Sequence, residues 1–331
     1  MDRKQVIIVA LEKMRKQEFA NKQTFKARAY SIVIKQLKEH KGPITSVDDL
    51  KDMYGIGDGI RKKIIEIIET GRLKQAEDSA SQALVEIMEK LLKVHGIGPV
   101  KARQLVEQHG VKSIEELKKR QDELLNDKQK TALKYVEDFD ARIPRSEMDK
   151  HAKFIKDTIL GIDKKYIVEL SGSYRRGEKD SGDVDVLITH PDETLDHDAN
   201  FARIIETFQK EKYVVDIFAQ GPKKCLAVSK AKRHKMFRRV DFMMTHKNEF
   251  PFALLYFTGS GPFNVEMRNI AIEKGYSLSE YGLKCMRGAR EGDLVNAGFT
   301  KEEDIFAFLD LPYIPPDLRK AGALAHHHTV S

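Results

Sequence analysis

One stretch of the chain, residues 171–189, restricts what it can fold into more than any other. It reads SGSYRRGEKDSGDVDVLIT, and its second half is an apolar run interrupted by Asp183 and Asp185. Side chains alternate faces along a strand, so these two carboxylates project from one face, while Val184 and Val186 project from the other. Neighbouring carboxylates repel each other, and a divalent cation between them removes the repulsion. The stretch therefore predicts a strand that carries a metal site.

The turn before this strand favours a phosphate ligand. Gly172 and Ser173 form a tight turn whose backbone N–H groups and hydroxyl can face a phosphate, and Arg175 and Arg176 add positive charge. Mg²⁺ commonly holds substrate phosphates against carboxylates. Together, the turn and the strand indicate a nucleotidyl-transfer site. Aspartates two residues apart are common on protein surfaces, so the pair alone leaves an ordinary surface strand as an alternative.

The spacing of these motifs resembles a known family. A Gly-Ser pair followed ten residues later by Asp-x-Asp on a β-run is the signature of the polymerase-beta-like nucleotidyltransferase superfamily, and the stretch closely resembles the palm motif of family X DNA polymerases. The resemblance covers the chain from about residue 5 to residue 320. It implies an α+β multidomain fold, in which all-α helix-hairpin-helix domains precede a nucleotidyltransferase palm with a mixed sheet and a small C-terminal α/β subdomain.

The periodicity of apolar residues supports this organisation. Helical patterns dominate up to about residue 160, with the first helices expected at residues 4–20, 24–39, 46–53 and 59–71. After Tyr166, five runs alternate apolar and polar residues and predict a sheet. We expect four domains: a lyase-like helix-hairpin-helix domain at 1–79, a second, duplex-binding hairpin subdomain at 80–141, the palm at 142–250, and a nucleotide-selecting subdomain with a disordered tail at 251–331.

An internal repeat occurs in the helical part. MYGIGDGIRKKIIE at 53–66 recurs as VHGIGPVKARQLVE at 94–107. Each copy places a Gly-x-Gly turn before an amphipathic helix, where small residues let backbone N–H groups approach a DNA phosphate. Two copies argue against an ordinary Gly-capped turn, and they predict DNA-backbone contacts at Gly55, Gly57, Gly96 and Gly98. The resemblance implies that backbone carbonyls of these turns hold Na⁺ or K⁺, namely those of Lys51, Met53, Ile56, Leu92, Val94 and Ile97.

A third carboxylate would let one cation also activate an attacking hydroxyl. Asp241 in RRVDFMM lies on another alternating run, and Arg239 projects from the same face, where it would neutralise nearby charge. A lone aspartate in a strand is more often structural. Its position after Asp-x-Asp in the family's order implies that Asp183, Asp185 and Asp241 together bind two Mg²⁺ ions, for which Mn²⁺ can substitute, and catalyse the transfer.

The resemblance also implies a nucleotide site. YFTGSGPFNVEMRN at 256–269 is similar to the family's nucleotide-binding segment, whose turn disfavours ribonucleotides. Asn264 would face the incoming base, while Arg268 and Arg239 would contact the template and primer strands. Gly261-Pro262 departs from better-known members, which carry a residue that stacks on the base. The expected contacts to the dNTP are Arg145, Ser173, Arg176, Gly182, Tyr256, Phe257, Gly259 and Asn264.

The N-terminal helices resemble the family's deoxyribose-phosphate lyase domain through NKQTFKARAYSIVIKQL and GIGDGIRKKIIEIIETGRL. By this resemblance, Lys63 is the amine that forms a Schiff base with the sugar aldehyde. Phe25 stands where a histidine is common, and Lys62 replaces an acidic neighbour that could assist elimination. The alternative is a domain that only grips a 5′-phosphate.

Composition agrees with a nucleic-acid partner. The 331 residues carry a formal charge of +7, and basic chains commonly bind acidic partners. The two cysteines form no CxxC pair, so neither a disulfide framework nor a zinc site is expected. No apolar run reaches the length of a membrane span. We expect a monomer inside the cell, in the nucleus or associated with a virus.

These patterns predict a template-directed DNA polymerase that fills short gaps in base-excision repair. It would add dNTPs to the primer 3′-OH of gapped or nicked double-stranded DNA. One alternative is a template-independent nucleotidyltransferase, against which the paired duplex-binding hairpins argue. Another is a catalytically silent DNA-binding scaffold, which has no need of three mutually repelling carboxylates. Since no BRCT-like extension precedes the first helices, recruitment through such a domain is not expected.

Overall fold

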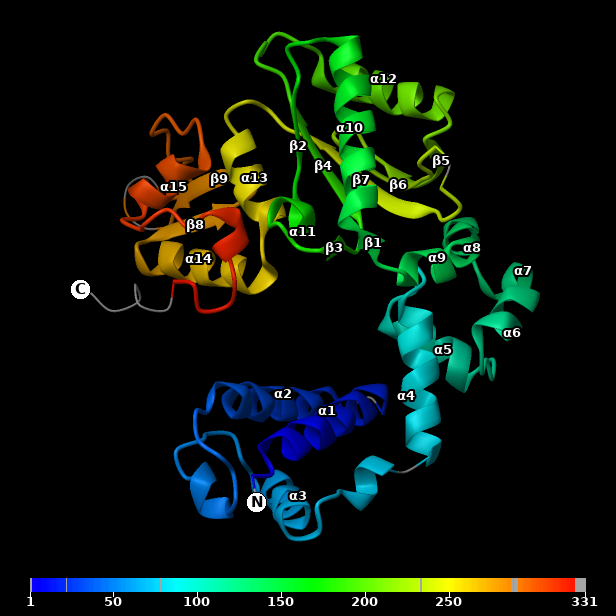
Figure 1. Cartoon of the computed structure of the whole chain (residues 1–331), viewed down its shortest axis with the longest axis vertical. Helices are drawn as coiled ribbons and strands as arrows, with labels where there is room; N and C mark the ends of the chain where they lie inside the picture. Colours follow the sequence, from blue (N-terminus) through cyan, green and yellow to red (C-terminus); the bar gives the residue numbers. More distant parts are fainter. Residues whose placement is uncertain are drawn as a thin grey trace. The chain divides into compact units, whose positions relative to one another are not determined.

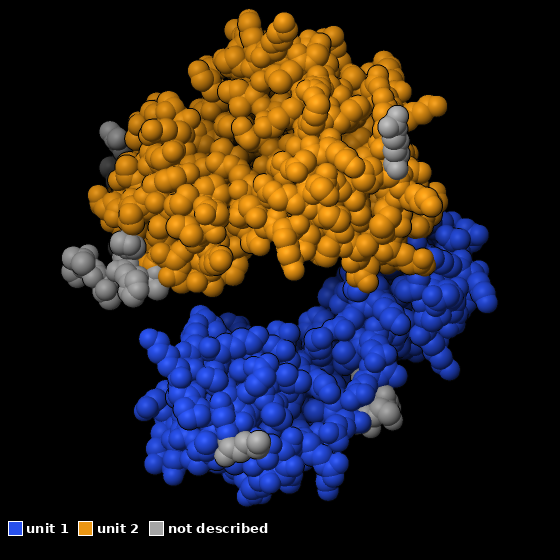
Figure 2. All heavy atoms as spheres, viewed as in Figure 1, with its two compact units in different colours: residues 1–133 blue, residues 134–331 orange. Residues whose placement is uncertain are grey.

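The computed structural model forms two compact units, residues 1–133 and 134–331, which Figure 2 colours separately. No helix among the residues that the structure describes combines the length and apolarity needed to cross a membrane. The tail that was expected to be disordered lies beyond the last described residue, and the described residues are 2–21, 23–77, 79–232, 234–286, 288 and 291–324.

In the first unit, the described elements are helical. Three helices enclose its N-terminal core, and they are α1 (Lys4–Ala20), α2 (Thr24–Glu39) and α3 (Asp58–Thr70). The helix predicted at residues 46–53 is wrong, because this segment forms only the short 3₁₀ helix η1 (Val47–Leu50). The Asp49 carboxylate accepts hydrogen bonds from the backbone N–H groups of Thr45 and Ser46 at 2.7 and 2.9 Å, as part of a capping box that fixes where this short helix begins.

Further helices follow in the chain, and α5 among them carries the second copy of the repeat. They are η2 (Lys74–Glu77), α4 (Ser79–Leu92), α5 (Pro99–Glu107), α6 (Ile114–Lys119), α7 (Gln121–Leu124) and α8 (Asp127–Lys134). Helix α4 packs against α1, and Leu91, Leu105 and Leu117 are buried among the helices of this region.

The second unit is built on a five-stranded mixed sheet with the strand order β2-β4-β7-β6-β5. Only β4 and β7 are parallel neighbours; the other pairs are antiparallel. Helices α10 (Arg145–Ile162) and α12 (His197–Lys210) lie over this sheet (Figure 1), and their apolar side chains share its core. The strands are β2 (Ile167–Leu170), β4 (Val184–Thr189), β5 (Val214–Gln220), β6 (Lys224–Ser229) and β7 (Arg238–Met244).

Short elements flank this sheet at its start. Helix α9 (Val136–Asp140) leads into β1 (Ile143–Pro144), which pairs with β3 (Asp180–Ser181). Between β2 and β3 lies the one-turn helix α11 (Gly172–Arg175).

The C-terminal part of the second unit has its own core around Phe263 and Phe306. Its elements are α13 (Phe250–Thr258), α14 (Gly261–Glu273), the hairpin β8 (Tyr276–Ser279) with β9 (Gly282–Cys285), α15 (Glu302–Phe308) and η3 (Pro316–Leu318). The hairpin is an addition to the short helices and loops that the sequence predicted.

The predicted α+β organisation is confirmed, and each of the five alternating runs contributes a strand. The predicted two-face pattern of β4 holds only in part, because Leu187 is buried on the same side of this strand as Asp185. Helix α13 packs against β4 there and shields it from solvent. The four domain boundaries stay predictions.

Candidate active site

The three predicted aspartates meet at one place in the second unit. Asp183 immediately precedes β4, Asp185 lies on β4, and Asp241 lies on the adjacent parallel strand β7. The register of β4 and β7 sets Asp185 directly opposite Asp241. One carboxylate oxygen from each of the three side chains lies within 4.8 Å of the others. The fold therefore brings together carboxylates from two strands that are far apart in the sequence.

The electrostatics of this group favour a cation. Burial, with the nearby Asp241 charge as a second cause, raises the pKa of Asp185 to about 7. Arg239 donates from Nη2 to Asp183 Oδ2, and its Nε lies 3.7 Å from Asp241 Oδ1. Lys224 and Arg176 also act on Asp185, but its pKa stays raised, so the nearby cations do not balance the burial and the carboxylate charges. A half-buried set of hard oxygen donors fits Mg²⁺ in charge and in chemistry.

The turn before β4 is shaped around Asp185. Gly172 has a φ of +60°, and a Cβ at this position would collide with Asp185 Oδ2. Only glycine satisfies both conditions, since left-handed backbone disfavours other residues. The sequence identified Gly172 as a turn residue, but its close approach to the carboxylate is visible only in the structure.

The predicted phosphate contacts lie beside the aspartates. Ser173 is held by a hydrogen bond of 2.9 Å between its Oγ and Ser181 Oγ. Arg176 donates from Nη1 to the carbonyl oxygen of Thr258 at 2.7 Å, which ties this turn to the end of α13. Gly182 lies in the exposed link between β3 and Asp183.

Arg145 braces the same turn from the start of α10. Its Nη1 donates to the carbonyl oxygens of Tyr174 and Glu178 at 3.0 and 3.2 Å, and its guanidinium lies 4.6 Å from the centre of the Tyr174 ring. These bonds leave Arg145 as a support for the turn in this structure. Its direct contact with a nucleotide stays a prediction.

Arg175 does not add free positive charge to the site, contrary to the expectation from sequence. Its guanidinium forms a bidentate ion pair with Glu302 at 2.7 and 3.0 Å and donates to Thr258 Oγ1 at 2.8 Å. Glu302 also accepts from the buried Arg319 at 2.8 Å. Since 127 residues separate Arg175 from Glu302, no local signal could have identified this pair.

The segment that follows α13 completes the site. Phe257 and Asp185 line one small cavity together with Lys224 of β6. Asn264 donates from Nδ2 to the carbonyl oxygen of Tyr256 at 2.7 Å, and the Arg268 guanidinium lies 4.9 Å from the centre of the Tyr256 ring. The predicted nucleotide residues Tyr256 and Asn264 therefore contact each other. Lys224 is a neighbour of the aspartates that sequence reasoning missed, because only the β6–β7 pairing places it there.

Gly259 ends α13 with a φ of +65°, and an added Cβ there would lie 3.5 Å from Arg176 Nη1. That distance is an ordinary van der Waals contact, so the left-handed backbone, and not a lack of space, favours glycine at this position.

Known families match this chain along most of its length. Residues 142–247 match the DNA polymerase beta palm and residues 253–320 the DNA polymerase beta thumb. Residues 89–140 match the fingers domain of DNA polymerase lambda, and residues 2–73 match a helix-hairpin-helix domain. The chain belongs to the family X DNA polymerases.

Curated relatives agree with this assignment. DNA polymerase lambda of Rattus norvegicus is 31% identical over 307 residues, which cover 88% of this chain and 52% of the relative. DNA polymerase lambda of Arabidopsis thaliana is 29% identical over 312 residues, which cover 88% of this chain and 57% of the relative. This family X chain thus spans about half the length of the relatives that it matches. The palm match contains all three aspartates.

The two helix-hairpin-helix turns of this family X chain share one geometry. Gly55 and Gly96 have φ values of +79° and +83°. Gly57 and Gly98 precede α3 and α5, and a Cβ at either position would meet no atom within 4 Å. The backbone at the start of each helix is therefore open to a ligand, as a phosphate contact requires.

A glutamine braces each hairpin. Gln36 donates from Nε2 to the carbonyl oxygen of Tyr54 at 2.7 Å, and Gln129 donates to that of Gly96 at 2.7 Å. Among the carbonyls predicted to hold a monovalent cation, that of Val94 accepts a hydrogen bond from the Ile97 N–H at 3.0 Å. The monovalent-cation site stays a prediction.

Lys63 lies on α3, in the first unit, whereas the aspartates lie in the second. Its Nζ donates to the carbonyl oxygen of Gly59 at 3.4 Å. Phe25, at the start of α2, is 89% exposed. The structure places both residues on helices of the matched hairpin domain.

Proposed function

We propose that this chain is a DNA-directed DNA polymerase that fills short gaps during nuclear base-excision repair. It transfers a nucleotide from a dNTP to the primer 3′-OH of gapped or nicked double-stranded DNA. The observation that supports this most directly is the parallel pairing that sets Asp185 opposite Asp241, beside the Gly172-Ser173 turn. Carboxylates facing a phosphate-directed turn suit phosphoryl transfer, in which positioning and charge stabilisation supply most of the catalysis.

Each residue has a role in this proposal. The backbone and hydroxyl of the Ser173 turn, with Arg176 and Gly182, bind the triphosphate and balance the charge that spreads over it in the transition state. Arg239 holds Asp183 and Asp241 in place through its two contacts. Phe257 lines the cavity next to Asp185 and excludes water from it.

The residues that would hold two Mg²⁺ ions are Asp183, Asp185 and Asp241, whose oxygens already converge. When bound, the ions would polarise the phosphate and the primer hydroxyl and lower the cost of their approach. Mn²⁺ has the same preference for oxygen ligands and would substitute. Na⁺ or K⁺ at the hairpin turns would strengthen the grip on the DNA backbone.

The remaining parts of the chain select and hold the substrates. The two hairpins grip the phosphates of the duplex through their open backbone N–H groups, which ignore base identity. Asn264 and Arg268 face the nascent base pair and the template, with Tyr256 and Gly259 shaping the pocket for the sugar. The chain acts as a monomer in this proposal.

Primer extension on a one-nucleotide gap tests the main activity. We expect incorporation of the complementary dNTP with Mg²⁺ and none with EDTA. The same assay on a primer without template separates the proposal from template-independent transfer. Extension of the unpaired primer at the rate seen on the gap would refute the templated reaction. If neither substrate were extended, the polymerase proposal would fail, and a catalytically silent DNA-binding scaffold would be the remaining hypothesis.

We also propose a 5′-deoxyribose-phosphate lyase activity at Lys63. Its support is the position of this amine on α3, directly after the first hairpin, together with the match of residues 2–73 to a helix-hairpin-helix domain. An amine that forms an imine with the sugar aldehyde can be trapped covalently by borohydride. Absence of any adduct, with protein that fills the same gap, would leave the domain as a 5′-phosphate clamp.

A further inference from the structure

A cavity of about 120 Å³ lies on the side of the sheet opposite to the aspartates. Tyr213 lines it and packs against Phe208, whose ring stacks on Phe242 at 5.0 Å between centroids. Side chains alternate along β7, so Phe242 and its neighbour Asp241 face opposite sides. The cavity is therefore separate from the polymerase site.

Four lysines surround this cavity, and one carboxylate accompanies them. The lysines are Lys150, Lys212, Lys230 and Lys232, and the carboxylate is that of Glu211. In the part of the chain that the structure describes, none of the four lysines forms an ion pair with a carboxylate. Lys150 donates instead to His234 at 3.3 Å, while Lys230 and Lys232 lie over aromatic rings. Unbalanced like charges around one cavity repel each other, and an anion relieves that repulsion.

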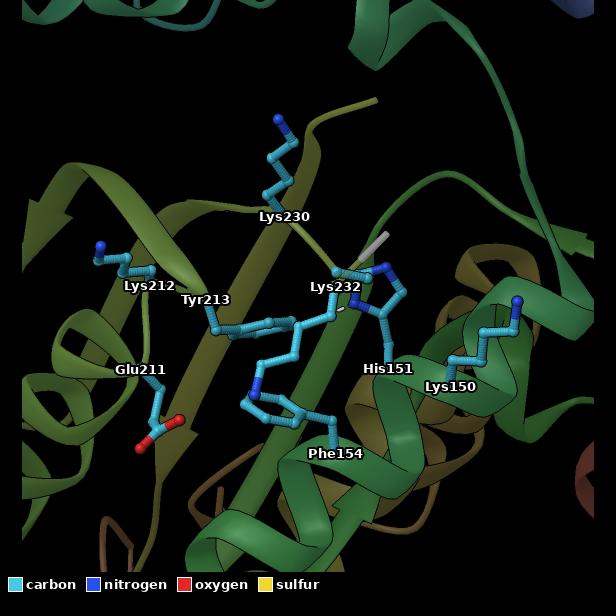
Figure 3. A pocket seen from close by; sticks show the side chains of 9 residues that line it. Lys150, His151, Phe154, Glu211, Lys212, Tyr213, Lys230 and Lys232 are labelled. Atoms are coloured by element: carbon cyan, nitrogen blue, oxygen red, sulfur yellow. Dashed lines mark hydrogen bonds between the residues drawn. The ribbon is translucent and has the colours of Figure 1, made fainter. Parts of the chain in front are cut away.

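The base of the cavity is buried and contains polar groups. His151 is fully buried, and its Nδ1 lies 2.6 Å from the Tyr213 hydroxyl. Burial lowers the pKa of His151 to about 4, so the ring is neutral near pH 7 and adds no charge. Phe154 supplies an aromatic wall, and the Lys232 side chain extends across it with Nζ 5.7 Å from the ring centre (Figure 3). Such a surface can contact a flat ring as well as an anion.

One of the lysines occupies a strained position. Lys212 follows the C-terminus of α12 with a φ of +57°, in the left-handed region that favours glycine. This conformation closes the helix, because the Tyr213 N–H donates across it to the carbonyl oxygen of Phe208 at 2.9 Å. In Figure 3, Lys212 and Lys150 lie at opposite sides of the pocket with Lys230 above them, and all three amines point toward the top of the view.

We infer that this cavity binds a phosphate group. Lys212 and Lys232 would neutralise it, and Phe154 would contact an attached base or sugar. The phosphate can come from a free nucleotide or from a nucleic-acid strand, and both present the same group to the lysines. This inference stands apart from the proposed polymerase activity, because none of its residues contributes to the aspartate site.

Phosphate binding to the full chain tests the inference. We would measure affinity by equilibrium dialysis and location by the backbone amide signals of Ala231 and Lys212 in NMR spectra. The location matters because phosphate is also expected at the Ser173 turn and at the hairpins. Three probes separate the sources: inorganic phosphate, a nucleoside monophosphate, and a short single strand with a 5′-phosphate. A shift of the Ala231 signal by the first two identifies a free ligand, and a shift only by the third identifies a strand.

Two variants and one control make the test specific. The double variant Lys212→Ala/Lys232→Ala should weaken binding at Ala231 by about tenfold or more, the effect of losing charge-assisted hydrogen bonds. Lys212→Gly removes one amine and also relieves the left-handed strain, so it should fold and still bind more weakly. Lys153→Ala is the control, since Lys153 lies on α10 but pairs with Asp157 at 2.7 Å.

The inference is overturned if none of the three probes shifts the Ala231 signal in the wild-type protein. It is equally overturned if Lys153→Ala weakens binding as much as the double variant, because binding would then reflect overall charge alone.

Discussion

Replacing Asp185 by asparagine should stabilise the metal-free protein while abolishing its proposed activity. The carboxyl has a pKa of about 7 instead of the usual 3.8, because burial and Asp241 both oppose its ionisation. At neutral pH, the ionised Asp185 carboxylate therefore lowers the free energy of unfolding. Asparagine has nearly the same shape and carries no charge, so the variant avoids that cost. The same change removes an oxygen ligand that the proposed metal site needs.

The size of the effect follows from the difference in pKa. Each factor of ten in proton affinity is worth about 1.36 kcal/mol, which gives an upper limit of about 4 kcal/mol for this carboxyl. Asp185 is only partly buried, so solvent screening reduces the expected gain to roughly 2 kcal/mol. For a unit of this size, that corresponds to about 4–8 °C in Tm.

The stability difference between Asp185→Asn and the wild type should depend on pH in a characteristic way. Below about pH 4, the carboxyl is protonated in the folded and the unfolded chain, so wild type and variant differ little. Between about pH 4 and pH 7, the unfolded chain ionises while the folded chain keeps the proton, so the wild type loses stability relative to the variant. Above about pH 7, the difference is constant.

Thermal unfolding in EDTA measures this difference. The matched control is Glu193→Gln, an exposed charge removal in the same unit that should change Tm little. Added Mg²⁺ should stabilise the wild type and stabilise Asp185→Asn much less, since ligands that bind only the folded state raise its stability. An equal Tm for wild type and variant at about pH 8, or a gain that does not grow from about pH 5 to pH 8, would refute the reasoning.

Three further predictions concern the proposed activities. Asp185→Ala and Asp241→Ala should each abolish nucleotide incorporation in primer extension while gapped-DNA binding stays within a few-fold, because metal ligands serve the chemistry more than the grip; near-normal turnover by either variant would contradict the metal assignment. Lys63→Ala should lose most of the borohydride-trapped adduct on an incised abasic site and keep gap filling, since the aspartates lie in the other unit; undiminished trapping would point to another amine. Gapped-DNA binding should weaken steeply with salt and vary little with sequence in competition assays, because the hairpins contact phosphates; a strong preference for one duplex sequence would contradict this mode.

The sequence predicted much of the secondary structure because the relevant signals are local. The helices expected at residues 4–20 and 24–39 agree with α1 and α2, where apolar residues recur at helical spacing. The helix expected at residues 46–53 begins where the sequence predicted, at the Ser46 cap, but it ends after one 3₁₀ turn at Leu50, and apolar periodicity does not register this early end. The glycines of both hairpins were recognised, and Gly55 and Gly96 have the left-handed backbone that favours this residue.

The sequence identified the three aspartates of the candidate site, but it could not predict that their strands lie next to each other. Local alternation placed Asp183 and Asp185 on one face of a strand, and it placed Arg239 and Asp241 on one face of another. Nothing local could pair the two strands, because register depends on packing and connections across the whole sheet. The same limit applies to Arg175, whose charge faces Glu302 instead of a substrate phosphate.

The sequence by itself therefore determined most of the long helices and the strands of the central sheet, which residues of a strand share a face, and where glycines shape the turns. These properties depend on the steric preferences of a few neighbouring residues. Only the tertiary structure decided that Asp185 lies opposite Asp241, that the Gly172 turn closes against Asp185, and that four lysines gather around one cavity. Those arrangements bring together distant parts of the chain, and their energies arise from packing and charge that exist only once the sheet and its helices have formed.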